Sequence, residues 1–455
     1  MTGSSTVKID MLSGSLFKKI LLFSLPLVAS GVLQQSFNAV DVIVVGRYCS
    51  HQALAAVGSN GAIINILINL FIGISIGSNV VIANYIGRKN ESGIRKAVAT
   101  SMAIAVGSGV FLLVLGMLLA RPLLELMNTP HDVIELATEY LKLFFLGMPF
   151  MMVYNFGAAI MRSMGDTRRP FYSLVVAGLA NTLLNLVLVI KFDMGVSGVA
   201  IATVLANVIN ATFITRWLLK ESDPFRLSFR KVRLHATQMR QMLQIGVPAG
   251  LQGMVFSIAN IFIQSAINRY GSNAVAGSAA ALNYEVYCYF IMVAFCQATT
   301  AFVSQNYGAG LYDRCRRAFR LCMIMSVVGV GLANLLIVWQ DRFFLGIFSS
   351  DATVVEYGII RLHYVLLLQF MASSYEISGS ALRGLGYSMT PMVLTVFGTC
   401  VLRLVWIYTV CASVSDFSLL LSIYPISWAI TGAAVYIAYR RISSRVYNDR
   451  LRKVA

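Results

Sequence analysis

A few polar and ionisable side chains interrupt the long apolar stretches of this 455-residue chain, and their types could do chemistry. In the first stretch, Gln34, Asn38 and Asp41 follow an i, i+4, i+7 pattern, which places them on one face of a helix. Later stretches of the same half add amides and a hydroxyl at Asn155, Asn181, Asn185 and Thr203. A carboxylate among such oxygens can hold a proton or a sodium ion, although amides in apolar helices also serve simply as interhelical hydrogen-bond partners.

The second half of the chain carries its own charged set, Glu285, Glu376 and Arg403. An arginine surrounded by apolar residues needs a partner, so we expect Arg403 to pair with Glu376 or Glu285. The glutamate that is left over is then free to titrate or to attract a cation.

Flexible and aromatic side chains gather around Glu285, namely Tyr284, Tyr287 and Met292. Methionine repacks around varied apolar molecules and aromatic faces attract cations, so these residues, with Gln34 and Asn38, are candidates for a substrate cavity. Ordinary packing is the alternative for each of them. Pro26 and Pro248 interrupt apolar stretches and are candidate hinges, because proline removes a helical hydrogen bond.

The elements that position these residues follow from the composition. Hydrophobic residues make up 58% of the chain and charged residues 12%, against about 45–50% and about 25% in soluble domains. This excludes a soluble enzyme, a nucleic-acid module and a disordered scaffold, and indicates an all-α, multi-pass membrane protein. The seven cysteines form no CxxC pair, and the chain lacks HExxH, GxSxG and phosphate-loop motifs. We therefore expect no disulfide framework, metal, cofactor or catalytic residue.

Apolar windows of about 20 residues predict twelve membrane-spanning helices. They lie near 17–46, 57–86, 97–120, 138–162, 170–190, 195–219, 241–268, 276–306, 319–339, 358–382, 389–411 and 417–439. Apart from Arg403, the lysines and arginines divide into 28 that we assign to one side of the membrane and 7, including Arg361, that we assign to the other. The positive-inside rule then places both termini in the cytoplasm and explains the net charge of +17 without a nucleic-acid partner.

The two halves of the chain look alike. Pro26 matches Pro248 at an offset of 222, and Asn84-Tyr85 matches Asn306-Tyr307 at the same offset. The near-constant offset predicts two parallel six-helix repeats, an arrangement typical of transporters. We place the N-terminal lobe at 1–219, a basic cytoplasmic linker at 220–240 and the C-terminal lobe at 241–455.

Several stretches carry a family resemblance, including SFNAVDVIVVGRY at 36–48, GAAIMRSMGDTRRP at 157–170, GVSGVAIATVLANVI at 195–209 and SGSALRGLGYSMTP at 378–391. On these the chain is similar to bacterial multidrug and toxic compound extrusion (MATE) transporters along nearly its whole length. The resemblance implies twelve helices in two pseudo-symmetric six-helix bundles that form a V-shaped cleft. It also implies a monomer in the inner membrane that exports amphipathic, usually cationic compounds in exchange for protons or sodium.

The resemblance also assigns site residues. An aspartate in the first helix is the usual ion-coupling residue of the family, which matches Asp41, and Asn155, Asn181 and Thr203 match its accompanying polar positions. Many relatives carry aspartate where this chain has Asn185, a departure that favours protons over sodium. A lipid-linked oligosaccharide flippase of the same wider superfamily is the first alternative, and a lipid-modifying membrane enzyme is a remote one.

Overall fold

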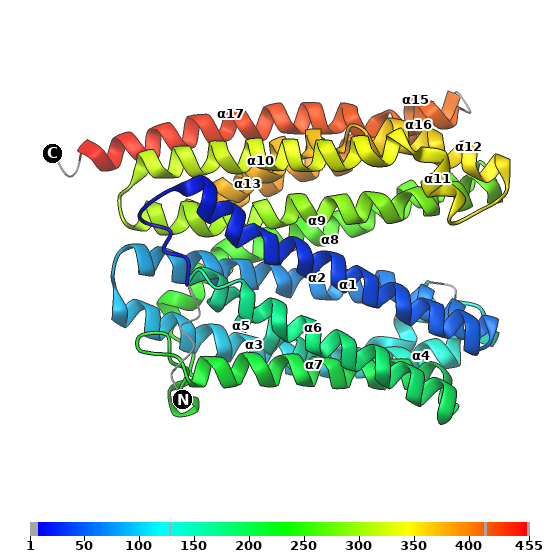
Figure 1. Cartoon of the computed structure of the whole chain (residues 1–455), viewed down its shortest axis with the longest axis horizontal. Coiled ribbons are helices and arrows are strands. Elements are labelled where there is room, and N and C mark those ends of the chain that lie inside the picture. Colours follow the sequence, from blue (N-terminus) through cyan, green and yellow to red (C-terminus); the bar gives the residue numbers. More distant parts are fainter. Residues whose placement is uncertain (1–7, 128, 414–415, 453–455) are drawn as a thin grey trace. The chain divides into compact units, whose positions relative to one another are not determined.

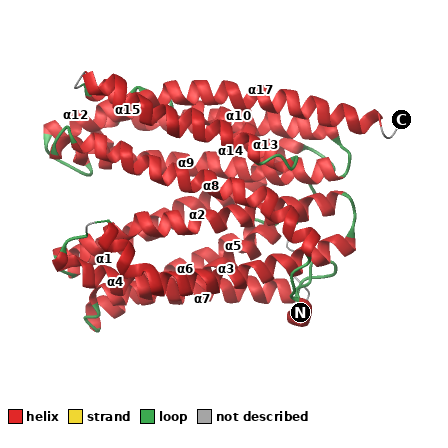
Figure 2. Ribbon diagram, turned by 180° about the vertical axis from the view of Figure 1, so that it is seen from behind, coloured by secondary structure: helices red, strands yellow, loops and turns green. Residues whose placement is uncertain are grey.

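The computed structural model of the protein describes residues 8–127, 129–413 and 416–452, and these form helices and connecting loops without a strand (Figures 1 and 2). The first half contains α1 (Leu16–Tyr48), α2 (His51–Gly87), α3 (Glu91–Leu126), α4 (His131–Leu146), α5 (Met148–Ser163), α6 (Arg168–Asn185), the π-helical turn η1 (Leu186–Lys191) and α7 (Gly195–Leu219). The short 3₁₀ turn η2 (Phe229–Lys231) follows in the segment that leads to α8 (Ala236–Asn268).

The second half continues with α9 (Ser272–Gly308), α10 (Tyr312–Trp339), α11 (Asp341–Gly346) and α12 (Ala352–Arg361). The next span is irregular, with a π turn η3 (Leu362–Leu366), a 3₁₀ turn η4 (Gln369–Ala372) and then α13 (Ser373–Gly384). The chain ends with α14 (Met389–Thr395), η5 (Val396–Val401), α15 (Leu402–Ser413), α16 (Phe417–Leu421) and α17 (Ile423–Arg452).

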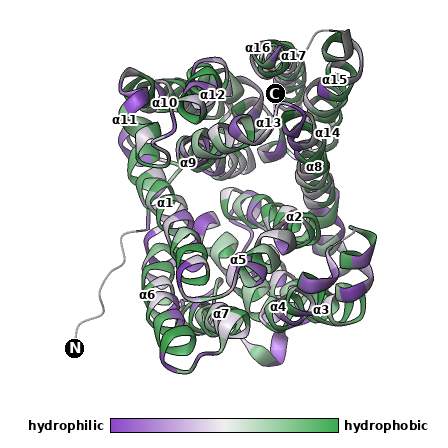
Figure 3. Ribbon diagram, turned by 90° about the vertical axis from the view of Figure 1, so that its right-hand side faces the viewer, coloured by the Kyte–Doolittle hydropathy of each residue, from purple (hydrophilic) through white to green (hydrophobic). Residues whose placement is uncertain are grey.

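Long apolar helices account for the predicted spans. Eleven helices of the described chain are long and apolar enough to cross a membrane, and α4 with α5 makes a twelfth that bends by 47°. The bend falls at Gly147, inside the predicted span 138–162; Gly147 and Pro149 are residues that favour a helix break, although hydropathy alone predicts one continuous span here. Large apolar side chains such as Leu118 and Leu332 are 69% and 63% exposed, as a lipid-facing surface requires. Figure 3 shows how hydrophobic residues dominate the helices.

The backbone confirms the internal repeat. Gly165 and Gly386 lie 221 residues apart, and both adopt a positive φ, at +86° and +93°. Each donates its N–H to the carbonyl three residues earlier, Arg162 at 3.0 Å and Arg383 at 2.9 Å. Left-handed backbone at this turn explains the glycine in both copies, because a Cβ is unfavourable there.

The described chain packs as two compact units. The described residues within Met1–Asp10 and Ala29–Gly250 form unit one, and those within Met11–Val28 and Leu251–Ala455 form unit two. The first helix of each half, α1 or α8, is therefore shared, because its opening turns belong to the unit formed mainly by the other half. The predicted lobes, 1–219 and 241–455, stay a prediction about where the repeats begin and end.

Candidate functional site

A chain of hydrogen bonds in unit one joins α1, α6 and α7. Asn185, the last residue of α6, is fully buried, and its Nδ2 donates to Asp41 Oδ1 on α1 and to Asn181 Oδ1 at 3.3 Å. The Nδ2 of Asn181 donates in turn to Thr203 Oγ1 on α7 at 3.5 Å. Four of the five residues predicted for the site are thus brought together, with the carboxylate at one end.

Local packing brings α1 close to α6 at the level of this chain. Gly178 lies under the ring of Phe37, so that a Cβ at that position would come within 1.8 Å of a ring carbon. One turn further along, α6 passes Asn181 and ends at Asn185, where the π turn η1 begins. Because π turns occur frequently at functional sites, the break directly after Asn185 supports a functional reading of the cluster.

One oxygen of the cluster has no partner. The amide Oδ1 of Asn185 is buried and accepts no hydrogen bond from any described residue. A buried acceptor without a donor costs free energy, so a proton carried by a neighbouring group, a water or a cation would stabilise it. The Asp41 carboxylate and this amide oxygen are both ligands that a hard cation accepts, and the carboxylate alone suffices for a proton.

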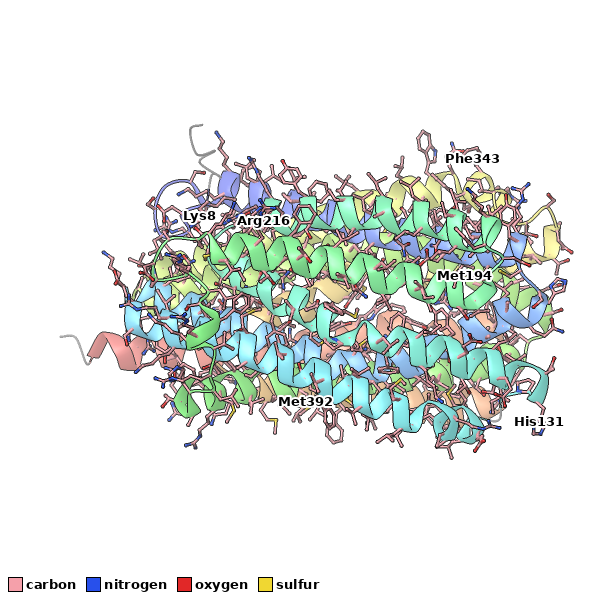
Figure 4. The ribbon with its side chains drawn as sticks, turned by 90° about the horizontal axis from the view of Figure 1, so that it is seen from below. Lys8, His131, Met194, Arg216, Phe343 and Met392 are labelled. Carbon is pink, nitrogen blue, oxygen red and sulfur yellow. The ribbon has the colours of Figure 1, made fainter. Side chains whose placement is uncertain are left out.

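The remaining predicted residues of unit one lie apart from the hydrogen-bonded chain. Asn155 turns its Nδ2 back to the Met151 carbonyl of its own helix at 2.9 Å, and within the described part of the chain it forms no hydrogen bond with Asp41. Gln34 and Asn38 are exposed on α1, on the face that also carries Asp41. Figure 4 shows the ends of this unit, with Lys8 and Arg216 at one end and His131 at the other.

In unit two, Glu285 of α9 is held by Arg361 of α12. The guanidinium donates through Nε and NH2 to the two carboxylate oxygens at 2.6 and 2.9 Å, and both side chains are less than 10% exposed. The predicted pairing of Arg403 with a glutamate is therefore wrong. The division of charges assigns Arg361 to one side of the membrane, but the residue is buried inside the span Ala352–Gly384. Its position near the start of an apolar window was the signal that could have identified it.

Arg403 has aromatic and hydroxyl neighbours instead of a carboxylate. Its Nε donates to Ser427 Oγ at 3.1 Å, and its guanidinium lies 4.3 Å from the centre of the Tyr424 ring. The Arg361 guanidinium lies 5.7 Å from the same ring. Aromatic faces attract cations, so the two buried arginines share one ring while a single carboxylate neutralises one of them.

The other predicted residues of unit two fall in different surroundings. Glu376 is partly buried on α13 and forms no ion pair with a described residue. The hydroxyl of Tyr284 donates to the Phe344 carbonyl at 2.7 Å, and Met292 is 1% exposed, which indicates packing for both. Tyr287 is half-buried. Pro26 and Pro248 each lie two residues before the point where a first helix passes from one unit to the other.

These features define an all-helical, multi-pass membrane protein with an internal repeat and polar groups inside its spans. Comparison with known proteins adds a family. A family model described as MatE matches twice, over residues 26–187 and 248–409, a shift of 222 residues. The chain is 28% identical to the probable multidrug resistance protein YoeA of Bacillus subtilis over 390 residues, which is 84% of each chain.

Solved structures share the fold. One is described as the outward-facing conformation of a multidrug resistance MATE family transporter of the MOP superfamily, with a TM-score of 0.91, 22% identity and coverage of 98% of this chain and 100% of that one. Another, a MOP superfamily transporter from Pyrococcus furiosus described as having a binding pocket of reverse polarity, gives a TM-score of 0.90 at 21% identity, covering 98% and 99%. The chain belongs to the MatE family. It is a bacterial-type MATE multidrug efflux transporter rather than an enzyme.

Proposed function

We propose that this transporter exports amphipathic, mostly cationic compounds in exchange for protons, with sodium as the alternative ion, and that Asp41 carries the coupling ion. The observation that supports the proposal is the hydrogen-bonded chain from Asp41 through Asn185 and Asn181 to Thr203. A charged carboxylate inside a membrane span costs free energy, so such residues are found mainly where they serve function. Asp41 has a neutral amide rather than a cation as its partner.

The coupling follows from differential binding. An ion that reaches Asp41 from outside neutralises the carboxylate, so the amide of Asn185 loses a charged acceptor and α1 is held less strongly against α6. Release of the ion on the inside restores the charge and, with it, the affinity for a cationic substrate. A membrane potential supplies about 2.3 kcal/mol per charge per 100 mV for this cycle.

The topology is part of the proposal. The excess of lysine and arginine on one side favours cytoplasmic termini in the inner membrane. We also propose that the protein is a monomer that takes its small-molecule substrates from the bilayer or the cytoplasm.

Transport in sealed vesicles tests the proposal. Efflux of an ethidium-like dye is measured with a proton gradient or a sodium gradient imposed separately, for the parent chain and for Asp41→Asn. We expect the proton gradient to drive efflux by the parent and not by Asp41→Asn, because asparagine cannot release a proton. Asp132→Asn, an exposed position in the first turn of α4, removes a carboxylate elsewhere and should transport like the parent.

The outcomes separate the parts of the proposal. Full efflux by a folded Asp41→Asn protein would remove Asp41 from the mechanism. Efflux driven by a sodium gradient alone would show that sodium and not the proton is the coupling ion, and would leave the assignment of the site unchanged. No dye transport by the parent under either gradient would favour the flippase alternative.

A further inference from the structure

The segment between α7 and α8 forms a basic pocket in unit one. The pocket has a volume of about 530 Å³ and is lined by the start of α3 and by residues 226–231, including η2. Leu219, which lines the pocket, lies three residues after Arg216 in the last turn of α7, so the pocket lies at the end of the unit where Figure 4 labels Arg216. None of its lining residues takes part in the hydrogen-bonded chain around Asp41.

The charge of the pocket is strongly positive. Four cations line it, and one carboxylate, Asp223, opposes them; the cations are Arg95, Arg226, Arg230 and Lys231. Arg95 also has Glu91 at 3.7 Å, whereas the other three pair with no carboxylate of the described chain. The pKa of the neighbouring His235 is lowered, first by partial burial and then by Arg233 and Lys96, which agrees with a positive local potential.

The pocket is a built structure and not a loose loop. Leu227 is only 3% exposed, packs in the same cluster as Ile94 and Val98 of α3, and donates its N–H to the Leu218 carbonyl at 3.0 Å. At the far end of the segment, His235 N–H donates to Thr100 Oγ1 at 3.1 Å. The cations are thus presented from a backbone that is fixed at both ends to α3 and α7.

The position of the pocket at the ends of two membrane spans indicates a lipid ligand. Arg95 lies in the second turn of α3, and Leu219 is the last residue of α7, so the pocket lies where two membrane spans begin and end. Two large apolar side chains of the same segment are exposed: Phe229, which lines the pocket, by 66%, and Leu234 by 56%. Apolar side chains at the level of the head groups insert toward acyl chains, and a pocket for a soluble anion has no need of them.

We propose that this pocket binds the phosphodiester head group of an anionic phospholipid of the cytoplasmic leaflet, with the cations on the phosphate and Phe229 against the acyl chains. Basic pockets at the cytoplasmic ends of membrane helices bind such head groups. The pocket volume lies in the range of sites for small ligands, about 300–1,000 Å³.

Native mass spectrometry of the purified full-length protein tests the proposal. Bound phosphatidylglycerol and phosphatidylcholine of equal acyl length are compared for the parent and for a variant with Arg226→Gln, Arg230→Gln and Lys231→Gln. The matched control carries Arg317→Gln, Arg440→Gln and Arg441→Gln, three exposed cations predicted to lie on the same side of the membrane. The melting temperatures of all three proteins show whether they are equally folded.

We expect the parent to prefer phosphatidylglycerol, and the pocket variant to bind that lipid at least about tenfold more weakly, since each cation near the surface contributes about 1 kcal/mol. The control variant should keep most of the preference. Equal losses of phosphatidylglycerol binding in both variants would show that the lipid is attracted by the general positive charge of the protein, and would overturn the proposal of a specific site. Displacement of the lipid by inorganic phosphate at equal concentration would show that the pocket is a site for soluble anions and would overturn the proposal of a lipid ligand. Equal binding of both lipids by the parent would overturn the proposal altogether.

Discussion

The Glu285–Arg361 pair shows what a single buried charge requires. Both side chains lie inside the spans and are almost completely buried, and the two hydrogen bonds at 2.6 and 2.9 Å use both carboxylate oxygens. The Nε2 of Gln369 adds a bond to the Glu285 carbonyl at 3.0 Å, which fixes α9 against η4. Burial of two charges costs free energy, and removal of only one of them costs still more because the other is left buried and unpaired.

We therefore expect Glu285→Gln and Arg361→Met each to lower the unfolding free energy by about 3–5 kcal/mol, because each leaves a buried charge unpaired. The double variant leaves no charge and should lose less than the sum of the two. Unfolding in detergent measures all three proteins. The exposed pair Arg342–Glu356 provides the control, since its members are 74% and 57% exposed and Glu356→Gln should cost about 0–1 kcal/mol. Additive losses in the double variant would contradict the pairing.

Individual residues of the site in unit one could be predicted from the sequence. The i, i+4 spacing of Asn181 and Asn185 places both amides on one helix face, and a carboxylate in an apolar stretch needs such neighbours. The partner of Glu285 could not be predicted in the same way. Arg361 and Glu285 are 76 residues apart, and only the packing of α12 against α9 shows that these two side chains meet.

At the scale of elements, the contact between α2 and the first part of α8 depends on glycines. A Cβ at Gly73 would lie 2.2 Å from the Gly250 nitrogen, and one at Gly246 would lie 2.4 Å from the Ile74 Cα. Backbone meets backbone here, so no side chain can move aside to make room. Small residues permit such close approach between membrane helices.

Gly73→Ala should therefore destabilise the protein by about 1–3 kcal/mol, the usual cost of overpacking. Gly107 of α3 is the matched control, because nothing lies within 4 Å of its would-be Cβ. Gly107→Ala should be neutral or stabilise by up to about 1 kcal/mol, since alanine is the better helix former. Thermal unfolding of the two variants decides the matter, and equal stability would contradict the close contact.

A second contact between elements is electrostatic and gives a pH dependence. Glu221, just beyond α7, pairs with Lys8 and, through Oε2, with Arg169 of α6 at 2.8 Å. Burial raises the pKa of its carboxyl, but the hydrogen bonds from Lys8 and Arg169 outweigh it and leave the pKa below the ordinary 4.5. A carboxyl with a lowered pKa in the folded state stabilises the protein above its unfolded pKa, and this contribution is lost as the pH falls.

Glu221→Gln should accordingly lower stability at pH 7 by at least about 1 kcal/mol, because Lys8 is partly exposed but Glu221 and Arg169 are only 9% and 11% exposed. As the pH falls below the unfolded pKa of about 4.3 and then through the lowered folded pKa, the parent carboxyl is protonated as well, so the difference between the two proteins should shrink. Melting temperatures of both proteins across this pH range provide the measurement. A difference that stays constant with pH would show that Glu221 acts through packing and not through its charge.

The elements themselves were largely predictable, and their interruptions were not. Twelve apolar windows correspond to eleven long helices and one bent pair, because length and apolar composition are properties of each segment alone. The π turns η1, η3 and η5 depend on what packs beside each helix, and close packing at Gly147 adds to the break that Pro149 favours. At Gly147, for example, Val204 and Asn207 of α7 lie within 3.4 Å of a would-be Cβ.

For the whole molecule, the decisive feature is that two helices are shared between the units. In α1 the division falls between Val28 and Ala29, and in α8 between Gly250 and Leu251, at equivalent positions of the repeat. Each division follows a proline by two residues, Pro26 or Pro248. A helix can bend at proline because one hydrogen bond is missing, so both shared helices have their most deformable point next to the division.

If transport requires the units to move, both prolines should matter for rate and neither for stability. Pro26→Ala and Pro248→Ala each restore a backbone hydrogen bond, so the melting temperatures of these variants should equal or exceed that of the parent. Gradient-driven dye efflux should fall at least about tenfold, which corresponds to an activation barrier higher by about 1.4 kcal/mol. Pro122 of α3 is the internal control, because it also lies inside a long helix but far from any division between units. Pro122→Ala should keep the parent rate. Equal slowing by all three replacements would show a general effect of straightening helices, and loss in only one of the shared helices would show that the two repeats do not bend alike.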